Sequence, residues 1–250
     1  NKLEGFMPHF FINSKNVDTD KITVDDKENF NHIAKSLRAK IGEKLLLIDE
    51  NQIEYTTQII EITNKSILCN IISSEHSKRD LPYNLYLAQS PLKSDAQLTI
   101  MEKATELGIR EVYPIYTDNC ALKKSIAEKK VEKWQKIMYE ASKQCERAII
   151  PTCNDLTTLD TVLKSKKFDK ILTLCERNTK DSLKNYLRTN PAKKDENILV
   201  IIGPEGGFSE KEFQLFKDMN LPMLSLGDLI LKAETAVIVT LGNIVYEYGE

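Results

Sequence analysis

The sequence predicts an α/β protein in which a small β-rich domain precedes a larger parallel sheet covered by helices. Residues 8–76 hold short β-branched runs separated by polar turns, the pattern of a small barrel or sandwich. From Leu81 onward, apolar runs alternate with longer amphipathic segments, which is typical of a parallel sheet. We therefore expect two domains, at residues 7–76 and 81–250, with the polar stretch 73–80 as the linker.

The first domain is expected to contain five strands and one helix. Each strand is a short run, rich in β-branched or aromatic side chains, that ends in a polar turn. These runs are HFFI (9–12), KITV (21–24), EKLLLID (43–49), EYTTQIIEI (54–62) and SILCNII (66–72). The segment DKENFNHIAKSLR (26–38) interrupts them with a helical pattern.

The second domain is expected to contain five strands with helices between them. The strands are NLYLAQ (84–89), EVYPIY (111–116), KILTLC (170–175), ILVIIG (198–203) and PMLSLG (222–227). Capping boxes predict helix starts at residues 94–97, 125–128 and 209–212. Two of the helices carry apolar stripes that we interpret as core: Ile100, Met101, Ala104 and Leu107, and then Val131, Trp134, Met138, Ala141 and Cys145.

Composition and cysteine usage indicate an ordinary globular chain in a reducing compartment. The 250 residues carry a net charge of −2, and no apolar run is long enough to span a membrane. The N-terminus lacks the basic-then-apolar pattern of a signal peptide. Five cysteines without a CxxC pair and three scattered histidines predict free thiols, no metal site and a cytoplasmic location.

Basic residues are concentrated in two regions despite the near-neutral total. Residues 121–150 hold eight Lys or Arg against four Glu, and residues 161–194 hold ten against three acidic residues. Such an excess favours phosphate binding, and solvated helix faces are the alternative.

A tight glycine turn late in the chain is the main functional signal. In NILVIIGPEGGFSEKEF (197–213), an apolar strand stops at a five-residue turn that holds three of the nine glycines of the chain. A helix follows the turn, and Phe208 and Phe213 stand where a hydrophobic staple would lie. Glycines let backbone groups approach a ligand closely. The turn has neither the P-loop pattern nor the GxGxxG spacing. We expect a ligand held by backbone groups, such as an adenine or an amino-acid-like group, with a simple β–α connection as the alternative.

Two more loops are expected beside this turn. Residues 225–227 end the last strand in another glycine turn, and residues 229–231 form an apolar wall after it. A third loop, 175–178, follows the strand KILTLC. Because the carboxyl ends of parallel strands meet at one edge of a sheet, the three loops would frame a cleft there.

The pair IGPEGGFSEKE (202–212) and LSLGDLILKAETA (224–236) resembles the RsmE family of the SPOUT superfamily. These methyltransferases act on N3 of a uridine in 16S ribosomal RNA. Four other stretches match family segments in order: MPHFF (7–11), HIAKSLRAKIGEKLLLID (32–49), QSPLKSDAQLTIMEKATELGIREVYPI (89–115) and ASKQCERA (141–148). The resemblance therefore covers the chain from residue 7 onward.

The resemblance implies a SPOUT-type domain with a C-terminal trefoil knot, preceded by a PUA-like, RNA-binding β-barrel. It also implies a homodimer, S-adenosylmethionine as cofactor, and the 16S rRNA of the small ribosomal subunit as partner, with no membrane and no metal. The residues implied to bind the cofactor are Leu174, Glu176, Ile202, Gly203, Pro204, Glu205, Gly206, Gly207, Leu224, Ser225, Leu226, Gly227, Leu229, Ile230, Leu231, Glu234, Thr235 and Ala236.

Methylation of uridine N3 requires that its proton be removed or that the resulting anion be stabilised. Arg147, at the end of ASKQCERA, is expected to hold the uracil as it becomes an anion. Glu205 or Glu234 is expected to accept the proton or to fix the loops, and a first-turn helix role is the alternative for Glu234. No histidine stands at an obvious base position, so the general base stays unassigned.

RNA contacts are expected at Lys35, Arg38, Lys93 and Arg147, with surface solvation as the alternative for the first two. Three departures from the family pattern bear on these contacts. His9 stands where the family usually has a basic residue, Ala96 stands where it has a second lysine, and the segment 228–232 has Asp228 and Lys232 where the family ends closer to LG.RILR.ETA.

Two rival functions remain open. One is a SPOUT methyltransferase that acts on another RNA position, such as a ribose 2′-hydroxyl or another base. The other is a non-catalytic RNA-binding factor for ribosome assembly, which would need no cofactor. A nicotinamide enzyme is excluded because the dinucleotide fingerprint is missing.

Overall fold

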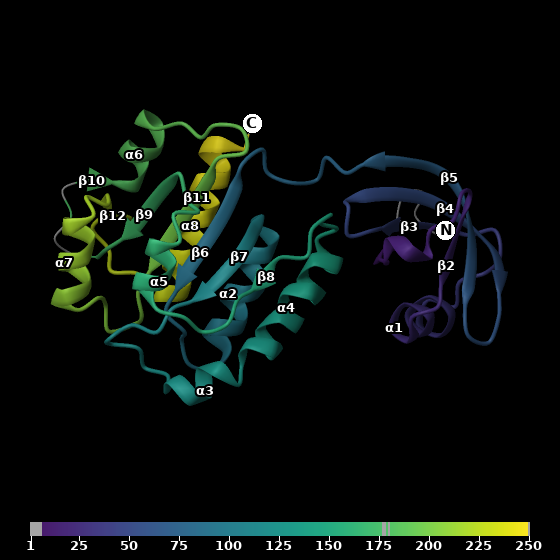
Figure 1. Cartoon of the computed structure of the whole chain (residues 1–250), viewed down its shortest axis with the longest axis horizontal. Coiled ribbons are helices and arrows are strands. Elements are labelled where there is room, and N and C mark those ends of the chain that lie inside the picture. The colour runs from purple at the N-terminus through teal and green to yellow at the C-terminus, as the bar shows by residue number, and fades with distance from the viewer. Residues whose placement is uncertain (1–6, 177–178, 180, 250) are drawn as a thin grey trace. The chain divides into compact units, whose positions relative to one another are not determined.

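The structure is a computed structural model that describes residues 7–176, 179 and 181–249. The chain forms two compact units, and each is described by itself (Figure 1). The N-terminal unit comprises Asn1–Asp80 and Glu146–Ile149, and the larger unit comprises Leu81–Cys145 and Ile150–Glu250. The predicted combination of a small β domain with an α/β domain is confirmed.

The N-terminal unit is a five-stranded sheet in the order β1-β3-β4-β5-β2. Its strands are β1 (His9–Phe11), β2 (Lys21–Val24), β3 (Lys44–Ile48), β4 (Ile53–Ile62) and β5 (Ile67–His76), and only β1 and β3 pair in parallel. The predicted helix is split into α1 (Lys27–Phe30) and a π-helical turn, η2 (Asn31–Ser36), and a 3-10 turn, η1 (Ser14–Asn16), precedes β2. Phe10, Ile22, Ile33, Leu47 and Ile59 are fully buried in its core.

The predicted linker is wrong in its first half. Residues 73–76 continue β5, whose last residue, His76, pairs with Ile53 at the start of β4. The side chains of residues 73–76 face solvent, which explains why the stretch looks like a loop in the sequence. Arg79 then binds back to its own unit through Glu54 at 3.6 Å and Glu146 at 2.7 Å.

The larger unit is a seven-stranded parallel sheet in the order β10-β12-β9-β11-β6-β7-β8. Five strands lie where the sequence predicts them: β6 (Asn84–Gln89), β7 (Ile109–Pro114), β9 (Lys170–Leu174), β11 (Asn197–Ile202) and β12 (Met223–Ser225). Two strands of two residues were not predicted, β8 (Thr152–Cys153) and β10 (Asp181–Ser182). β6, β9 and β11 form the buried centre of the sheet, as their continuous apolar runs indicate.

Helices cover both faces of this sheet (Figure 1). One face packs against α2 (Ser94–Glu106), α3 (Lys124–Glu128), α4 (Val131–Gln144), α6 (Leu183–Thr189) and α8 (Ala233–Tyr248). The other packs against α5 (Leu159–Lys164) and α7 (Glu210–Asp218). The predicted apolar stripes are confirmed, because Ile100, Met101 and Ala104 on α2 and Trp134 and Met138 on α4 are buried.

Of the three predicted capping boxes, only the last is confirmed. Ser209 accepts a hydrogen bond from the Glu212 N–H at 3.3 Å, and Glu212 accepts one from the Ser209 N–H at 2.7 Å. α2 begins one residue earlier and α3 two residues earlier than the boxes predict, and their N-cap residues are Lys93 and Lys123, which provide no side-chain cap. In α2, Gln97 accepts instead from the Leu92 N–H outside the helix, at 2.8 Å.

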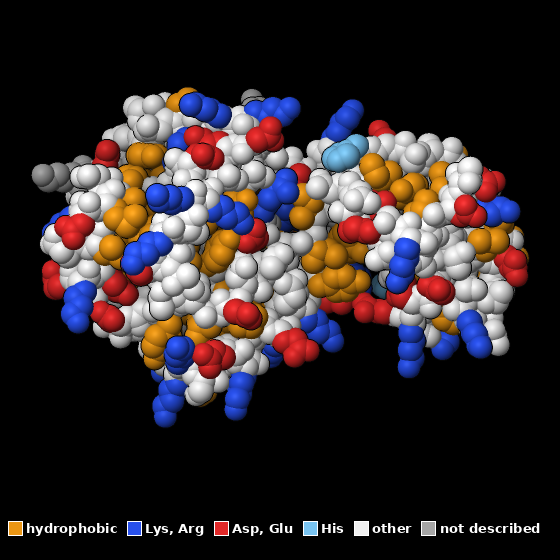
Figure 2. Space-filling view, in the orientation of Figure 1, with side chains coloured by type: hydrophobic (Ala, Val, Ile, Leu, Met, Phe, Trp, Pro, Cys, Tyr) orange, Lys and Arg blue, Asp and Glu red, His pale blue; other side chains and the backbone are white. Residues whose placement is uncertain are grey.

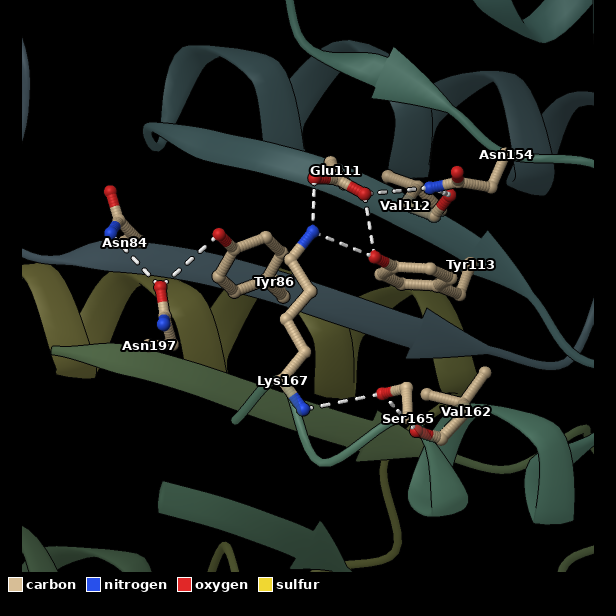
Figure 3. A network of polar contacts seen from close by, with 10 residues as sticks. All are labelled: Asn84, Tyr86, Glu111, Val112, Tyr113, Asn154, Val162, Ser165, Lys167 and Asn197. Atoms are coloured by element: carbon tan, nitrogen blue, oxygen red, sulfur yellow. Dashed lines mark hydrogen bonds and ion pairs between the residues drawn. The ribbon is translucent and has the colours of Figure 1, made fainter. Parts of the chain in front are cut away.

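A polar network crosses the sheet face that packs against α5 (Figure 3). Glu111 on β7 accepts hydrogen bonds from Lys167, from the Tyr113 hydroxyl at 2.6 Å and from Asn154 at 3.1 Å. The Lys167 ammonium also lies 4.5 Å from the centre of the Tyr86 ring. Burial alone would raise the pKa of Glu111, but these hydrogen bonds lower it below its ordinary value. The network therefore holds a charged pair within a largely apolar layer.

The described residues offer neither a membrane-spanning helix nor a cluster of metal ligands. In the part of the chain that the structure describes, no helix has the length and apolarity to cross a bilayer. Within the same residues, no three His, Cys, Asp or Glu side chains are grouped so that they could hold a metal ion. All five cysteines are free thiols.

Candidate functional site

A cavity of about 540 Å³ opens at the carboxyl edge of the parallel sheet. Small-molecule sites in proteins have volumes of roughly 300–1,000 Å³. The lining comes from the loops after β9, β11 and β12 and from the starts of α7 and α8. Its residues are Leu174, Cys175, Glu176, Ile202, Gly203, Pro204, Glu205, Gly206, Gly207, Phe208, Glu210, Phe213, Leu226, Gly227, Leu229, Leu231, Ala233 and Ala236.

The strand order explains why these loops meet. β9 lies between β12 and β11, and all three strands run in parallel. Each chain segment therefore leaves its strand at the same edge, as the sequence predicted. Arg177 and Asn178, which belong to the third predicted loop, lie outside the described residues.

Packing favours glycine at two positions of the 203–207 turn, and the backbone conformation favours it at the third. A Cβ on Gly203 would lie 3.2 Å from two ring carbons of Phe208, and a Cβ on Gly206 would lie 3.1 Å from the Cβ of Asn119. Gly207 has a φ of +70°, in the left-handed region that favours glycine. The turn therefore needs glycines for its own shape, in addition to the ligand access that the sequence suggests.

A loop after β7, residues 117–120, holds the glycine turn from outside. The Asn119 side-chain amide donates to the carbonyl oxygens of Gly206 at 3.3 Å and Gly207 at 3.1 Å. Next to it, the Ser209 hydroxyl donates to an oxygen of Asp118 at 2.6 Å. These contacts fix the wall of the cavity to a segment almost ninety residues earlier in the chain.

The cavity lining is apolar and acidic. Glu176, Glu205 and Glu210 belong to it, and no lysine, arginine or histidine does among the described residues. Burial raises the pKa of the Cys175 thiol to about 12, so this group stays neutral. Such a lining suits a ligand that combines apolar groups with positive charge.

The structure places most of the predicted cofactor residues around this cavity. Five of them do not line it: Leu224, Ser225, Ile230, Glu234 and Thr235. Leu224 is buried in the sheet beside Leu174, and Ile230 is 64% exposed. All eighteen stay predictions as cofactor contacts.

Five lining residues are not among the eighteen predicted cofactor residues, namely Cys175, Phe208, Glu210, Phe213 and Ala233. A signal is available for three of them. Cys175 belongs to the predicted loop 175–178, and Phe208 and Phe213 form the predicted hydrophobic staple, with ring centroids 6.1 Å apart. A staple next to a ligand-binding turn places its own rings against the cavity.

Comparison with known proteins identifies the family. The RNA methyltransferase domain family matches residues 79–245, and the RNA methyltransferase PUA domain family matches residues 24–72. Ribosomal RNA small subunit methyltransferase E from Mesomycoplasma hyopneumoniae is 30% identical over 234 residues, which cover 93% of this chain and 96% of that protein. This chain belongs to the RsmE family of RNA methyltransferases.

Other proteins match this chain in sequence or in structure over nearly its whole length. The protein of the same name from Bacillus subtilis is 27% identical over 225 residues, 88% of each chain. A protein from Legionella pneumophila, solved in complex with the cofactor SAM, superposes with a TM-score of 0.81 at 28% identity, covering 96% of this chain and 98% of that one. The SAM-bound RsmE structure from Neisseria gonorrhoeae shares the fold, with a TM-score of 0.82 at 22% identity over 97% and 98% of the two chains.

The three residues that the sequence predicts to be catalytic lie in both units. Glu205 is exposed in the glycine turn and lines the cavity. Glu234 is half-buried in the first turn of α8. Arg147 belongs to the N-terminal unit, where it is buried and donates a hydrogen bond to Asp80 at 3.2 Å.

Three of the four predicted RNA contacts are exposed. Lys35 and Arg38 lie in the N-terminal unit, Lys93 is the N-cap of α2, and only Arg147 is buried.

The departures from the RsmE pattern fall at different places. His9 is buried, neither ring nitrogen has a hydrogen-bond partner among the described residues, and burial lowers its pKa. It is therefore neutral at pH 7, unlike the basic residue that it replaces. Ala96 packs against the core from α2, and Lys232 is exposed as the N-cap of α8.

Proposed function

We propose that this chain transfers a methyl group from S-adenosylmethionine to N3 of a uridine in the 16S rRNA of the small ribosomal subunit. The observation that carries the proposal is the cavity at the carboxyl edge of the sheet, framed by the three loops of a chain that belongs to the RsmE family. Relatives named for small-subunit rRNA methylation match it almost from end to end, which supports the RNA substrate.

The residues around the cavity fit this cofactor. A sulfonium ion and an ammonium group are positive, and the lining offers three glutamates and no cationic side chain among the described residues. Leu226, Leu229 and Leu231 provide apolar surface for an adenine ring, and the glycine turn exposes backbone groups. When bound, S-adenosylmethionine supplies an activated methyl group.

The chain's own residues would prepare the uridine. N3 carries a proton, so the base becomes a nucleophile only when that proton leaves. Arg147 is proposed to stabilise the resulting uracil anion, and Glu205 or Glu234 to accept the proton or to fix the loops. Lys35, Arg38 and Lys93 are proposed to contact RNA phosphates, in which case binding would weaken steeply as salt is raised.

Three further properties are proposed. The family resemblance implies a trefoil knot near the C-terminus and a homodimer, and the free cysteines indicate a cytoplasmic location. Large exposed apolar side chains support self-association, with Leu229 81%, Ile230 64% and Tyr246 85% exposed. Light scattering of the purified chain tests the dimer, and a mass equal to one chain across micromolar concentrations would exclude it.

The experiment that tests the function is a methyl-transfer assay with mapped products. Small ribosomal subunits from a strain that lacks the gene are incubated with the protein and isotope-labelled S-adenosylmethionine, and mass spectrometry of RNA fragments then locates the label. We expect one methyluridine modified at N3. A label on a ribose or on another base would indicate a different target, and failure to bind the cofactor would favour a non-catalytic assembly factor.

A further inference from the structure

The loop that holds the glycine turn continues directly into a row of lysines. Lys123 is the N-cap of α3 and Lys124 its first residue, and both side chains are exposed. Lys129, Lys133 and Lys136 follow on the exposed surface of α3 and α4. Lys and Arg side chains project into solvent around α3 (Figure 2).

These lysines are not held in ion pairs with described residues, and they outnumber Glu128 and Glu132, which lie among them. None of the five is in an ion pair with an acidic side chain of the described residues, whereas Lys103, Lys164 and Lys170 each pair with a carboxylate. A row of unpaired lysines attracts a polyanion such as the phosphate backbone of RNA.

The start of this row is fixed to the cavity wall. Asn119 lies four residues before Lys123, and its amide bridges the carbonyl oxygens of Gly206 and Gly207. The Asn119 Cβ also packs where a side chain on Gly206 would have to go. Any ligand that orders residues 117–124 therefore also restricts the turn that lines the cavity.

A buried hydrogen bond anchors the same loop to the sheet. The hydroxyls of Ser90 and Thr117 lie 2.7 Å apart, and both residues are fully buried. Ser90 follows β6, and the exposed Lys93 comes three residues later. Lys93, Lys123 and Lys124 thus all belong to segments that leave the sheet at its carboxyl edge, where the cavity opens.

We propose that segment 117–124 couples RNA binding to cofactor binding. RNA phosphates bind Lys123 and Lys124, and Asn119 acts as a positioning residue that holds the glycine turn for the cofactor. The inference rests on the proposed function, since it takes RNA and S-adenosylmethionine as the two ligands.

The sign of the coupling follows from the entropy of the loop. A phosphate bound at Lys123 and Lys124 adds a contact to the segment that holds Asn119 against the glycine turn, so less ordering remains for the cofactor to impose on residues 203–207. Coupling between two sites is reciprocal and typically amounts to about 5-fold or more in affinity. We therefore expect RNA to tighten cofactor binding about fivefold, and the cofactor to tighten RNA binding equally.

Titration calorimetry tests the coupling with S-adenosylhomocysteine, which cannot donate a methyl group, with and without small ribosomal subunits from the deletion strain. Asn119→Ala should raise the dissociation constant of S-adenosylhomocysteine about tenfold. In this variant, the dissociation constant should be the same with and without small ribosomal subunits. In the methylation assay, the same variant should raise KM for S-adenosylmethionine and leave kcat at saturation within about twofold. The double variant K123Q/K124Q should leave the subunit-free dissociation constant unchanged and lose the tightening by subunits.

Matched controls come from the opposite, amino edge of the same sheet. Asn84 donates from its amide to the Asp195 carbonyl oxygen at 3.2 Å and to the Asn197 side chain at 3.0 Å, and Figure 3 shows the second of these bonds. N84A therefore removes a similar pair of hydrogen bonds. Lys193 and Lys194 are consecutive exposed lysines that precede β11, and K193Q/K194Q removes the same charge. Both controls should retain wild-type cofactor affinity and the response to subunits.

Two results would overturn the inference. One is an Asn119→Ala protein that binds the compound as tightly as the wild type does, and the other is a wild-type affinity that does not respond to subunits. Either result leaves the proposed function intact as long as the wild type still methylates RNA. Absence of cofactor binding in the wild type would instead reject the proposed function itself.

Discussion

The contact between Gly203 and Phe208 can be tested by the substitution Gly203→Ala. The added Cβ would lie 3.2 Å from two carbons of the Phe208 ring, closer than ordinary van der Waals contact. The ring cannot easily move away, because it packs edge-to-face against Phe213 and Phe216, with centroids 6.1 Å and 5.0 Å away. The substitution therefore overpacks a rigid aromatic cluster beneath the cavity wall.

Overpacking of a well-packed core costs about 1–3 kcal/mol, and we expect Gly203→Ala to lower the free energy of unfolding by that amount. Replacing Phe208 by leucine removes the ring carbons that clash. The cost of the double variant should then be smaller than the sum of the single costs by about 1 kcal/mol, in the range seen for residues in contact. Gly203→Ala should also weaken cofactor binding, because both residues line the cavity.

Urea unfolding followed by circular dichroism measures the four free energies of this cycle. Gly207→Ala is the control, because a Cβ there meets nothing within 4 Å and the cost comes only from its φ of +70°, about 1–2 kcal/mol. Phe208→Leu should not relieve that cost. Free energies for Gly203→Ala and Phe208→Leu that add within about 0.5 kcal/mol would refute the packing argument.

Three further predictions concern the rest of the molecule. Arg147→Ala should lower kcat for methylation about 100-fold in a rate assay and leave the cofactor affinity unchanged in calorimetry. Arg188→Ala, at an exposed arginine, is the control. A variant Arg147→Ala that methylates as fast as the wild type would remove Arg147 from the mechanism. Glu111→Gln should lower stability by about 1 kcal/mol at pH 7, allowing for solvent around Lys167. Because the pKa of Glu111 is lowered in the fold, this difference should begin to shrink as the pH falls below about 4.3, the ordinary value for Glu, and should be lost once the pH passes the lowered pKa. A thermal-unfolding difference that does not shrink as the pH is lowered through this range would contradict the assignment. Burial raises the pKa of Cys175 to about 12, so this thiol should resist iodoacetamide at pH 8 in the folded protein and react in urea. Peptide mass spectrometry measures the labelling, and a labelled Cys175 in the folded protein would contradict this prediction.

The sequence was a good guide wherever a local pattern carries the structure. The buried strands β6 and β11 are continuous apolar runs with turns at both ends, so both could be located within a residue. β8 and β10 have two residues each, too few for any periodicity, and they exist only because β7 and β12 offer free backbone groups beside them. The early starts of α2 and α3 also lack a local sequence signal, because their N-cap residues are lysines, which do not cap helices with their side chains.

The candidate site divides in the same way. The glycine turn could be found from sequence because its five residues are contiguous and unusual in composition. Asn119 could not, because it meets Gly206 and Gly207 only after the chain has formed the sheet between them. Phe208 could be predicted in part: the sequence pattern indicates its staple role, but only the structure shows its contact with Gly203.

The cavity is completed by the segment that follows all of its other walls in the chain. Its final lining residues, Leu226 to Ala236, come after those of the loops that follow β9 and β11. A chain still emerging from the ribosome therefore lacks one whole wall until this segment has been made, and free cofactor cannot stabilise the fold before then. Folding of the sheet up to β11 must proceed without help from the ligand, so a truncated product would remain unprotected and open to proteolysis.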